Sequence, residues 1–310
     1  MFYFIVNPNS RSGAGKKIWD LLKKELDSRK VSYQVFMTRY MGHAVQLSQK
    51  ASSLGTAEKP AYLIAVGGDG TIQEVLTGIE DFDRVIFGYI PTGSGNDFCR
   101  GMSLPKDPGQ ALEVILSKKR IVPMDVPYVQ EGNRRSCFGV SAGIGFDAAV
   151  CQEVSVTPMK KVLNRLKLGK LIYLFSAVKQ LLLLTPGPMS ITMDGRKKQQ
   201  YEKVCFIAVM NQKYEGGGFR FCPDASPFDG LLDVLVAEGI SKPLLILCLP
   251  AALWGGHTRF KGIHIFRCKH IHIHSEECLP VHKDGEARNM EREFSVSFME
   301  KPLKVILPVL

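Results

Sequence analysis

The chain has 310 residues, which is enough for two domains of ordinary size. Hydrophobic residues make up 45% and charged residues 23% of it, proportions that are typical of a soluble globular protein. The formal net charge of +10 favours an anionic partner, such as a nucleotide or an acidic membrane. Nucleic acid is the least favoured partner, because the sequence contains no recognisable nucleic-acid-binding module.

The first part of the chain, up to about residue 124, alternates predicted strands and helices. Strands are predicted at 2–6, 31–37, 61–66 and 85–90, and helices at 14–26, 43–54, 71–78 and 111–116. This alternation predicts a parallel sheet covered on both faces, an α/β domain of the doubly wound type. Ligands of such sheets bind at the carboxyl ends of the strands.

After residue 124 the pattern changes to short predicted strands separated by Gly, Pro and Asp. They lie at 137–141, 189–193, 204–210, 232–236, 262–266, 270–274 and 294–298. This pattern predicts a mostly antiparallel β domain with a helical insertion at about 159–184. The insertion is basic in its first part and rich in Leu and aromatic residues in its second. It is either a surface helix or a segment whose Lys and Arg side chains contact anionic headgroups.

Eight cysteines are scattered without any Cys-x-x-Cys pair, mostly in apolar contexts, as is typical of small buried thiols. No secretory signal is visible, so we expect a reducing, cytoplasmic location. The longest apolar stretches, around 171–184 and 244–254, are too short or too interrupted to span a bilayer. Any membrane contact is therefore expected to be peripheral.

The most informative stretch is Gly67-Gly68-Asp69-Gly70-Thr71, between a predicted buried strand and a predicted helix. Glycines at such a junction let the backbone approach a ligand closely, and the N–H groups at a helix start can hold a phosphate. Asp69 adds the carboxylate that a Mg²⁺–nucleotide needs. A tight turn with glycine for geometry alone is the alternative interpretation.

Two further loops follow predicted strands in the same domain. Residues 7–16 resemble a P-loop but lack its pattern, because Ser10 stands at the first glycine position and Lys17 replaces Ser or Thr; N-capping explains this loop equally well. Residues 90–97 offer small side chains, a hydroxyl and the carboxylate of Asp97. We expect all three loops to gather along one edge of the sheet, where Asp97 would lie near Asp69.

Far downstream lies Lys283-Asp284-Gly285-Glu286. Asp-Gly is common in hairpins, so a structural turn is one interpretation. In the other, Glu286 projects into an interdomain cleft and takes the proton from an attacking hydroxyl.

Together, these motifs resemble the diacylglycerol kinase catalytic-domain family, and most of all its small bacterial lipid kinases. The motifs that carry the resemblance are Asn7-Pro8, Gly67–Thr71, Pro91–Asp97 and Asp284–Glu286. The resemblance covers nearly the whole chain, including residues 216–218 and 223–231. Gly-Gly-Asp-Gly-Thr is shared with NAD kinases and phosphofructokinase-like folds, whereas the Gly-Asn-Asp loop and the late Asp-Gly-Glu favour the lipid kinases.

The resemblance implies an NAD-kinase-like α/β nucleotide-binding domain over residues 1–124 and a β-rich, sandwich-like lipid-substrate domain over 125–301. Residues 302–310 would return to the first domain, with the active site and ATP in the interdomain cleft. The activity implied is Mg²⁺-dependent transfer of the ATP γ-phosphate to the hydroxyl of a membrane lipid, diacylglycerol or a related one. Such an enzyme would be cytoplasmic and would contact an anionic membrane peripherally.

The resemblance also implies roles for single residues. Glu286 would be the general base, and Asp69 and Asp97 would organise the Mg²⁺–ATP. A structural Mg²⁺ in the second domain would be bound by the side chain of Asp229 and the carbonyls of Ser226 and Leu231, which is oxygen-only chemistry. The implied nucleotide contacts are Asn7, Pro8, Asn9, Ser10, Arg11, Thr38, Gly68, Asp69, Gly70, Thr71, Ile72, Gln73, Glu74 and Ser94.

Three positions depart from the family pattern: His43 stands where Asp is frequent, Gln73 replaces a common Asn, and Ser94 a common Thr. Two rival functions stay open. One is an NAD kinase-like or other small-molecule kinase, and the other is a non-catalytic nucleotide or lipid sensor. The acceptor lipid is not identified by the sequence, and a homodimer through strand edges is a further open alternative.

A second group of residues suggests a metal site at first sight. His270, His272 and His274 alternate along a predicted strand, and three histidines on one face can hold Zn²⁺. A solvent-facing or interdomain strand face is the favoured interpretation.

Overall fold

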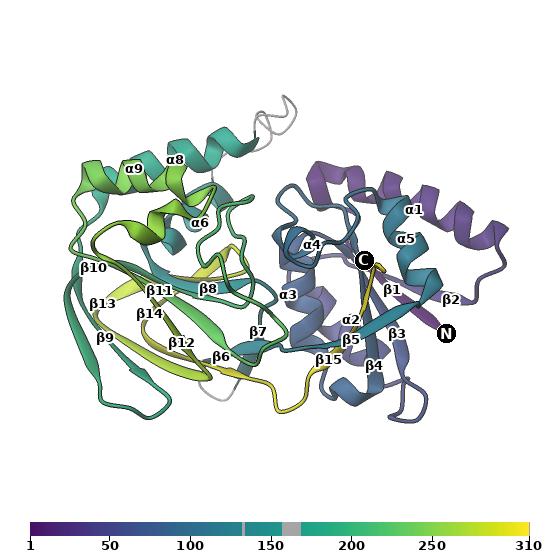
Figure 1. Ribbon diagram of the computed structural model, residues 1–310. Helices are drawn as coiled ribbons and strands as arrows, with labels where there is room; N and C mark the ends of the chain where they lie inside the picture. The colour runs from purple at the N-terminus through teal and green to yellow at the C-terminus, as the bar shows by residue number, and fades with distance from the viewer. Residues whose placement is uncertain (132–133, 157–168, 310) are drawn as a thin grey trace. The chain divides into compact units, whose positions relative to one another are not determined.

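The computed structural model describes residues 1–131, 134–156 and 169–309 (Figure 1). The chain divides into two compact units, residues 1–126 with 299–310, and residues 127–298. The first unit alternates strands and helices, whereas the second is built mainly from antiparallel strands. The α/β fold class predicted from the sequence is confirmed.

The first unit contains a six-stranded sheet in the order β2-β1-β3-β4-β15-β5. All neighbours are parallel except β5, which pairs antiparallel with β15. The strands are β1 (Phe2–Val6), β2 (Tyr33–Met37), β3 (Ala61–Gly67), β4 (Val85–Pro91), β5 (Arg120–Met124) and β15 (Leu303–Leu307). Since β3 and β4 are buried on both faces, they appear in the sequence as continuous apolar runs.

Helices pack on this sheet. They are α1 (Ser10–Ser28), α2 (His43–Ser52), α3 (Asp69–Gly78), the short α4 (Asp97–Gly101) and α5 (Pro108–Ser117). Trp19 and Leu26 of α1 share a core cluster with Leu112 and Ile115 of α5. Helices α2 and α3 pack against each other and on β3, and the Ser48 hydroxyl donates to the Val75 carbonyl across their interface (2.7 Å). Helix α3 is thereby fixed beside the loop that precedes it.

The second unit contains a nine-stranded antiparallel sheet. Its main path is β12-β11-β10-β8-β13-β14-β6-β7, and β9 pairs with both β10 and β13. The strands are β6 (Pro127–Glu131), β7 (Arg134–Cys137), β8 (Ser141–Gly145), β9 (Gly187–Met193), β10 (Gln199–Met210), β11 (Leu232–Glu238), β12 (Ile263–Cys268), β13 (His270–Lys283) and β14 (Glu286–Phe298). Alternate residues of these strands form one apolar core.

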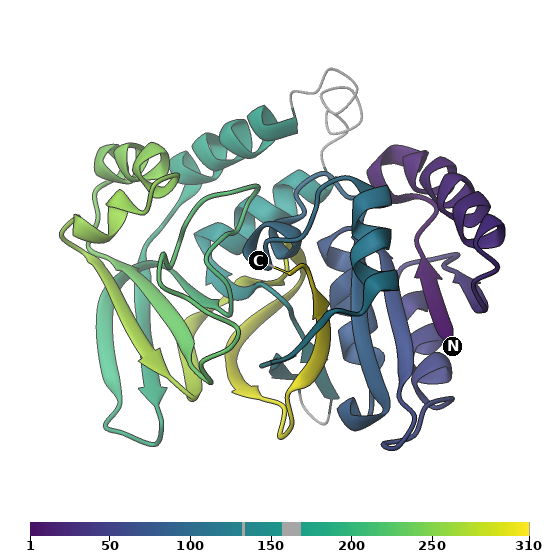
Figure 2. The same ribbon diagram turned by 45° about the vertical axis from the view of Figure 1, so that its right-hand side comes forward.

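Helices α6 (Phe146–Val156), α8 (Gly169–Leu183) and α9 (Lys242–Ala252) belong to the second unit (Figures 1 and 2). They share a second apolar cluster with β10 and β11, to which Val150, Leu181, Phe206, Leu235 and Leu245 contribute. No helix in the described ranges is both long enough and apolar enough to cross a lipid bilayer.

The structure corrects several sequence predictions in this unit. The predicted strand 137–141 is wrong, because β7 ends at Cys137 and β8 begins at Ser141. Helix α6 was not predicted, and neither was α9, whose continuous apolar sequence has no helical period. Of the helical insertion predicted at 159–184, residues 159–168 lie outside the described part of the chain, and α8 forms most of the remainder.

Candidate functional site

The three loops that follow β1, β3 and β4 meet at the carboxyl edge of the first sheet, as the strand–helix alternation predicted. Asn7 Nδ2 donates to Thr71 Oγ1 (3.1 Å), which links the first loop to the second. The hydroxyls of Ser10 and Thr92 share a hydrogen bond of 2.7 Å, and the Thr92 amide donates to the Gly67 carbonyl (2.7 Å). Hydrogen bonds between the loops therefore hold this edge together.

Two glycines let the second and third loops touch backbone to backbone. A Cβ atom on Gly93 would lie 2.6 Å from the Gly68 Cα, and one on Gly68 would lie 3.2 Å from the Gly93 Cα. On Gly67 it would lie 2.3 Å from Thr71 Oγ1. Close packing of the loops therefore requires glycine at these positions. The alternative interpretation from the sequence, a tight turn that needs glycine for its geometry, therefore applies here. It is compatible with phosphate binding.

Asp69 connects the same two loops through its carboxylate. Its oxygens accept hydrogen bonds from the backbone amides of Asp97 and Phe98, each at 3.2 Å, at the start of α4. Asp97 is buried, and its carboxylate forms an ion pair with Arg100, three residues later on α4. The structure thus brings Asp69 and Asp97 together. Arg100 was missed by the sequence reasoning, although its i,i+3 spacing from Asp97 is a usable signal.

The other expected nucleotide residues on α3 differ in their surroundings. Gln73 is buried, and its Nε2 donates to Thr77 Oγ1 (3.2 Å), while Ile72 is wholly enclosed. The Glu74 carboxylate accepts the amides of Gly42 (2.7 Å) and Ala44 (3.1 Å) at the start of α2. Glu74 therefore stabilises the N-terminus of α2, a role that the sequence alone did not indicate.

The remaining expected nucleotide residues lie on the loops. Thr38 follows β2 and is buried, and its amide donates to the Val6 carbonyl (2.9 Å). Ser94 and Arg11 are exposed, and the Asn9 amide donates to Asn7 Oδ1 (3.0 Å). The Pro8 carbonyl accepts the Lys16 amide (3.1 Å), and Gly70 lies in the first turn of α3.

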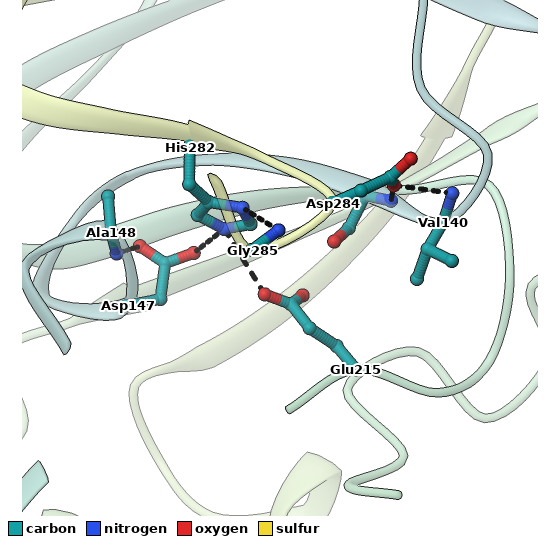
Figure 3. Close-up of polar contacts among 8 residues, drawn as sticks. Val140, Asp147, Ala148, Glu215, His282, Asp284 and Gly285 are labelled. Atoms are coloured by element: carbon teal, nitrogen blue, oxygen red, sulfur yellow. Dashed lines mark hydrogen bonds and ion pairs between the residues drawn. The ribbon is translucent and has the colours of Figure 1, made fainter. Parts of the chain in front are cut away.

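In the second unit, Asp284 and Gly285 form a two-residue turn between β13 and β14, with φ values of 47° and 80°. The hairpin interpretation is confirmed, and Glu286 is the first residue of β14, half-buried. The Asp284 carboxylate accepts the amides of Gly139 (2.8 Å), Val140 (2.7 Å) and Ser141 (3.1 Å), as Figure 3 shows in part. Burial raises the pKa of Asp284 to about 6 in spite of these bonds.

A buried charged group, which the sequence reasoning missed, adjoins this turn (Figure 3). His282 Nε2 lies 3.0 Å from Asp147 Oδ2 and 3.1 Å from Glu215 Oε1, and all three side chains are buried. Burial by itself would lower the pKa of His282, but the Glu215 and Asp147 carboxylates raise it well above its usual value. A Cβ atom on Gly143 would lie 2.0 Å from Asp147 Oδ2, so this group also requires glycine on the neighbouring strand.

Cys151 lies beside the same group, and one ligand atom each from Cys151, Glu215 and His282 fall within 4.8 Å of one another, close enough for a metal ion. Because Nε2 faces two carboxylates, it carries a proton, and the ion-pair interpretation fits better than ligation. Two features of the sequence could have indicated this buried group: the pattern Gly-x-Gly-x-Asp at 143–147, before a helix, and the position of His282 two residues before Asp284.

The residues expected to hold a second-domain Mg²⁺ lie in and beside the loop before β11. Asp229 Oδ1 accepts the Leu231 amide (3.1 Å), and its other oxygen forms an ion pair with Arg267 on β12. Arg267 Nε also lies 3.4 Å from Asp233 Oδ1. The Asp229 side chain and the carbonyls of Ser226 and Leu231 suit a hard cation, but a guanidinium already neutralises the Asp229 carboxylate.

The three alternating histidines of β13 each have a partner on β14. His270 Nδ1 lies 2.6 Å from Ser297 Oγ, His272 Nδ1 lies 2.9 Å from Ser295 Oγ, and His274 Nδ1 lies 3.4 Å from Glu293 Oε2. Cross-strand pairing of this kind favours the strand-face interpretation over zinc.

Solved structures show which fold this is. A structure from Bacillus anthracis (strain Sterne), described as a candidate diacylglycerol kinase, superposes with a TM-score of 0.79 at 24% identity, over 99% of this chain and 97% of that chain. An NAD kinase from Archaeoglobus fulgidus in complex with ATP superposes with a TM-score of 0.50 at 13% identity, over 99% and 93%. The fold is that of the NAD-kinase-like proteins.

Sequence comparison defines the family within this class. Residues 1–129 match the diacylglycerol kinase catalytic domain, and residues 140–306 match the YegS C-terminal NAD kinase beta sandwich-like domain. The chain is 30% identical to YtlR of Bacillus subtilis (strain 168), named as a candidate lipid kinase, over 98% of each chain. It is 28% identical to a diacylglycerol kinase of Mycobacterium tuberculosis (strain H37Rv), over 72% of this chain and 70% of the relative.

The chain belongs to the diacylglycerol kinase family, and the resemblance seen in the sequence is confirmed. It is therefore a lipid kinase, a phosphotransferase with an alcohol group as acceptor.

Proposed function

We propose that this lipid kinase transfers the γ-phosphate of ATP to the hydroxyl of a membrane lipid, diacylglycerol or a close relative of it. Relatives named diacylglycerol kinase support this acceptor class. The observation that carries the proposal is the Asp69 carboxylate, which joins two glycine-rich loops at the carboxyl edge of the parallel sheet. Such an edge is where α/β sheets bind nucleotides.

The first unit is the nucleotide-binding part in this proposal. The first turn of α3 offers backbone N–H groups and a positive helix dipole to the ATP phosphates. Asp69 and Asp97 supply oxygen atoms at the same edge, which is the chemistry that Mg²⁺ prefers. When bound with ATP, Mg²⁺ would neutralise charge that develops on the phosphoryl group. The flanking contacts would come from the loop residues Asn7 to Arg11, Thr38, Gly68 to Glu74 and Ser94.

In the second unit, Glu286 accepts the proton of the lipid hydroxyl. The hydroxyl oxygen forms a bond to the γ-phosphorus, the bond from that phosphorus to the bridging oxygen breaks, and ADP leaves. The position of Glu286 next to a turn held by Asp284 and three amides supports this role, because a general base must be held within hydrogen-bond reach of its proton.

We also propose that the second-domain Mg²⁺ binds only in competition with Arg267. The Asp229 carboxylate and the Ser226 and Leu231 carbonyls would be its ligands. The Arg267 guanidinium already provides a positive charge there, so Mg²⁺ would have to displace it from Asp229.

The test is an incubation of the purified protein with γ-labelled ATP, Mg²⁺ and mixed-lipid vesicles, followed by separation of organic-soluble products. We expect label in one lipid, whose mobility identifies the acceptor. Glu286→Gln should abolish this label and leave ATP binding nearly unchanged, since the glutamine keeps the size of the side chain and removes its basicity.

Glu276→Gln, at an exposed position of β13, is the matched control and should behave as wild type. Equal loss of ATP binding and transfer in Glu286→Gln would contradict the general-base role. No organic-phase label, with ATP binding intact, would favour a soluble acceptor, and NAD would be tested next. ATP binding without transfer to any acceptor would favour a sensor.

A further inference from the structure

Helices α8 and α9 are apolar on the side that faces solvent as well as on the side that faces the core. On the inner side, Ala177 and Leu181 of α8 and Leu245 of α9 are buried in the shared apolar cluster. The exposed apolar residues of the outer side, together with Trp254 in the turn just after α9, are called the apolar face below: Phe175, Leu182, Leu183, Ile246, Leu247 and Trp254. A helix that is apolar all round is normally buried in a core or in a membrane.

The exposure of this face is large. Leu182 is 72% exposed and Trp254 is 74% exposed, in contrast to the buried Leu181 next to Leu182. Phe175 and Leu182 are seven residues apart on α8, which is helical spacing, and Ile246 and Leu247 are neighbours on α9. Contiguous exposed apolar surface of this kind marks an interaction site.

The two helices form one surface. The Lys242 Nζ donates to the Leu182 carbonyl (2.8 Å), which joins the start of α9 to the end of α8. Both views show the two helices side by side (Figures 1 and 2). Because both pack inward on the same cluster, their outer sides are directed away from it together.

The chain segments that form the apolar face carry charges of one sign. The sequence has no Asp or Glu between Glu153 and Asp194, and none between Glu238 and Glu276, so the segments that contain α8 and α9 carry only cations. Lys179, Lys242, Arg259 and Lys261 are exposed there, and Lys179 pairs with Glu153. An apolar helical face with Trp and with basic flanks is the pattern of an interfacial helix, which lies on an anionic bilayer without crossing it.

We propose that the apolar face of α8 and α9 is the surface by which this enzyme docks on an anionic membrane, with Trp254 and Leu247 entering the headgroup region. The inference rests on the proposed function, because a membrane-lipid acceptor requires the enzyme to reach the bilayer. It names the partner of that activity as an anionic lipid surface.

The two tryptophans of the chain provide the first test. Trp19 is 2% exposed in the core of the first unit, so a change in emission on adding vesicles reports on Trp254. With vesicles of phosphatidylglycerol and phosphatidylcholine we expect a blue shift, and a much weaker one with phosphatidylcholine alone. The shift should disappear in Trp254→Phe, which keeps an aromatic residue for docking.

The second test measures docking directly, by co-sedimentation with the same vesicles. Leu247→Asp should weaken vesicle binding at least tenfold, because it places a charge on the apolar face. Leu21→Asp, at an exposed position of helix α1 in the first unit, is the matched control and should bind as wild type. Equal binding by Leu247→Asp and Leu21→Asp would overturn the proposal.

The kinase assay separates this inference from the proposed function. Leu247→Asp should retain phosphorylation of a short-chain acceptor dispersed in detergent, and Glu286→Gln should dock on vesicles without transfer. If Leu247→Asp also loses activity in detergent, the face belongs to the acceptor site and docking is wrong. If the protein forms a dimer without vesicles and Leu247→Asp dissociates it, the apolar face binds a second copy of the chain, and the docking proposal is overturned. Docking without lipid phosphorylation in wild type would support this inference and contradict the proposed function.

Discussion

His282 Nε2 lies 3.0 Å from Asp147 Oδ2, and both side chains are buried. This pair ties the end of β13, next to the Asp-Gly turn, to the first turn of α6. Glu215 Oε1 approaches the same nitrogen at 3.1 Å from a third segment of the chain. One imidazole nitrogen therefore pairs with two carboxylates from different segments of the chain.

Replacement of His282 by Gln should destabilise the second unit strongly. Loss of the cation leaves Asp147 and Glu215 buried without compensation, and breaking such a group typically costs about 3–5 kcal/mol. Urea unfolding followed by circular dichroism measures this cost. His270→Gln, on the exposed face of the same strand, should change the free energy of unfolding by less than about 0.5 kcal/mol.

The difference in unfolding free energy between wild type and His282→Gln should depend on pH, because the pKa of His282 is raised. Burial opposes the charged form, but Glu215 and Asp147 raise the pKa in the folded state. The stabilisation is therefore complete below the unfolded pKa of about 6.5 and is lost as the pH rises through the folded pKa. The difference between wild type and His282→Gln should be largest below about pH 6.5, should decrease progressively above it, and should vanish only above the raised folded pKa. A difference already lost at neutral pH would contradict the ion-pair interpretation.

Replacement of Gly93 by Ala should separate the second and third loops. The new Cβ would meet the Gly68 Cα at 2.6 Å, and backbone atoms can relieve such a contact only by moving. We expect a loss of about 1–3 kcal/mol in stability and at least tenfold weaker ATP binding by calorimetry. Gly187→Ala has open space around its Cβ and serves as the control. Similar ATP affinities for both variants would show that loop contact does not shape the nucleotide site.

The role of Asp69 in phosphoryl transfer should be separable from its role as an acceptor of helix amides. Asp69 accepts amides at the start of α4, and Asp107 accepts the Gln110 amide at the start of α5 (2.9 Å). Each Ala variant should lose about 1 kcal/mol of stability. Only Asp69→Ala should lose phosphoryl transfer, by a hundredfold or more, in the labelled-ATP assay. If transfer falls equally in Asp107→Ala, the loss reflects folding and not the chemistry of Asp69.

The competition between Arg267 and Mg²⁺ should be visible as metal-dependent stability. In wild type without ATP, we expect Mg²⁺ to raise the unfolding temperature only slightly, because Arg267 neutralises Asp229. Burial raises the pKa of Asp233 to about 6, and Arg267, which contacts both Asp229 and Asp233, lowers it. Arg267→Ala therefore leaves the carboxylates of Asp229 and Asp233 close together without this cation. Mg²⁺ should therefore stabilise Arg267→Ala clearly more than wild type or the exposed control Lys269→Ala. A large Mg²⁺ effect in wild type would indicate a dedicated metal site.

Local sequence determined the strands β1 to β4 of the first sheet and the place of the loops that follow them. Strand–helix alternation and glycines directly after apolar runs are short-range signals, so β1, β3 and β4 and the loops that follow them could be predicted. The same holds for the Asp284-Gly285 turn, whose residues favour the positive φ values that it adopts. The family motifs in the sequence also indicated the class of enzyme, a lipid kinase.

Only the tertiary structure decided which side chains meet. The predicted strand 137–141 failed because the amides of residues 139–141 bond to the Asp284 side chain, far along the chain. Helix α9 has no helical period, since it is apolar on both sides. The pairs Glu74 with the start of α2, Arg267 with Asp229, and His282 with Asp147 also join distant segments. Their partners are set by strand order and register, which no short stretch of sequence contains.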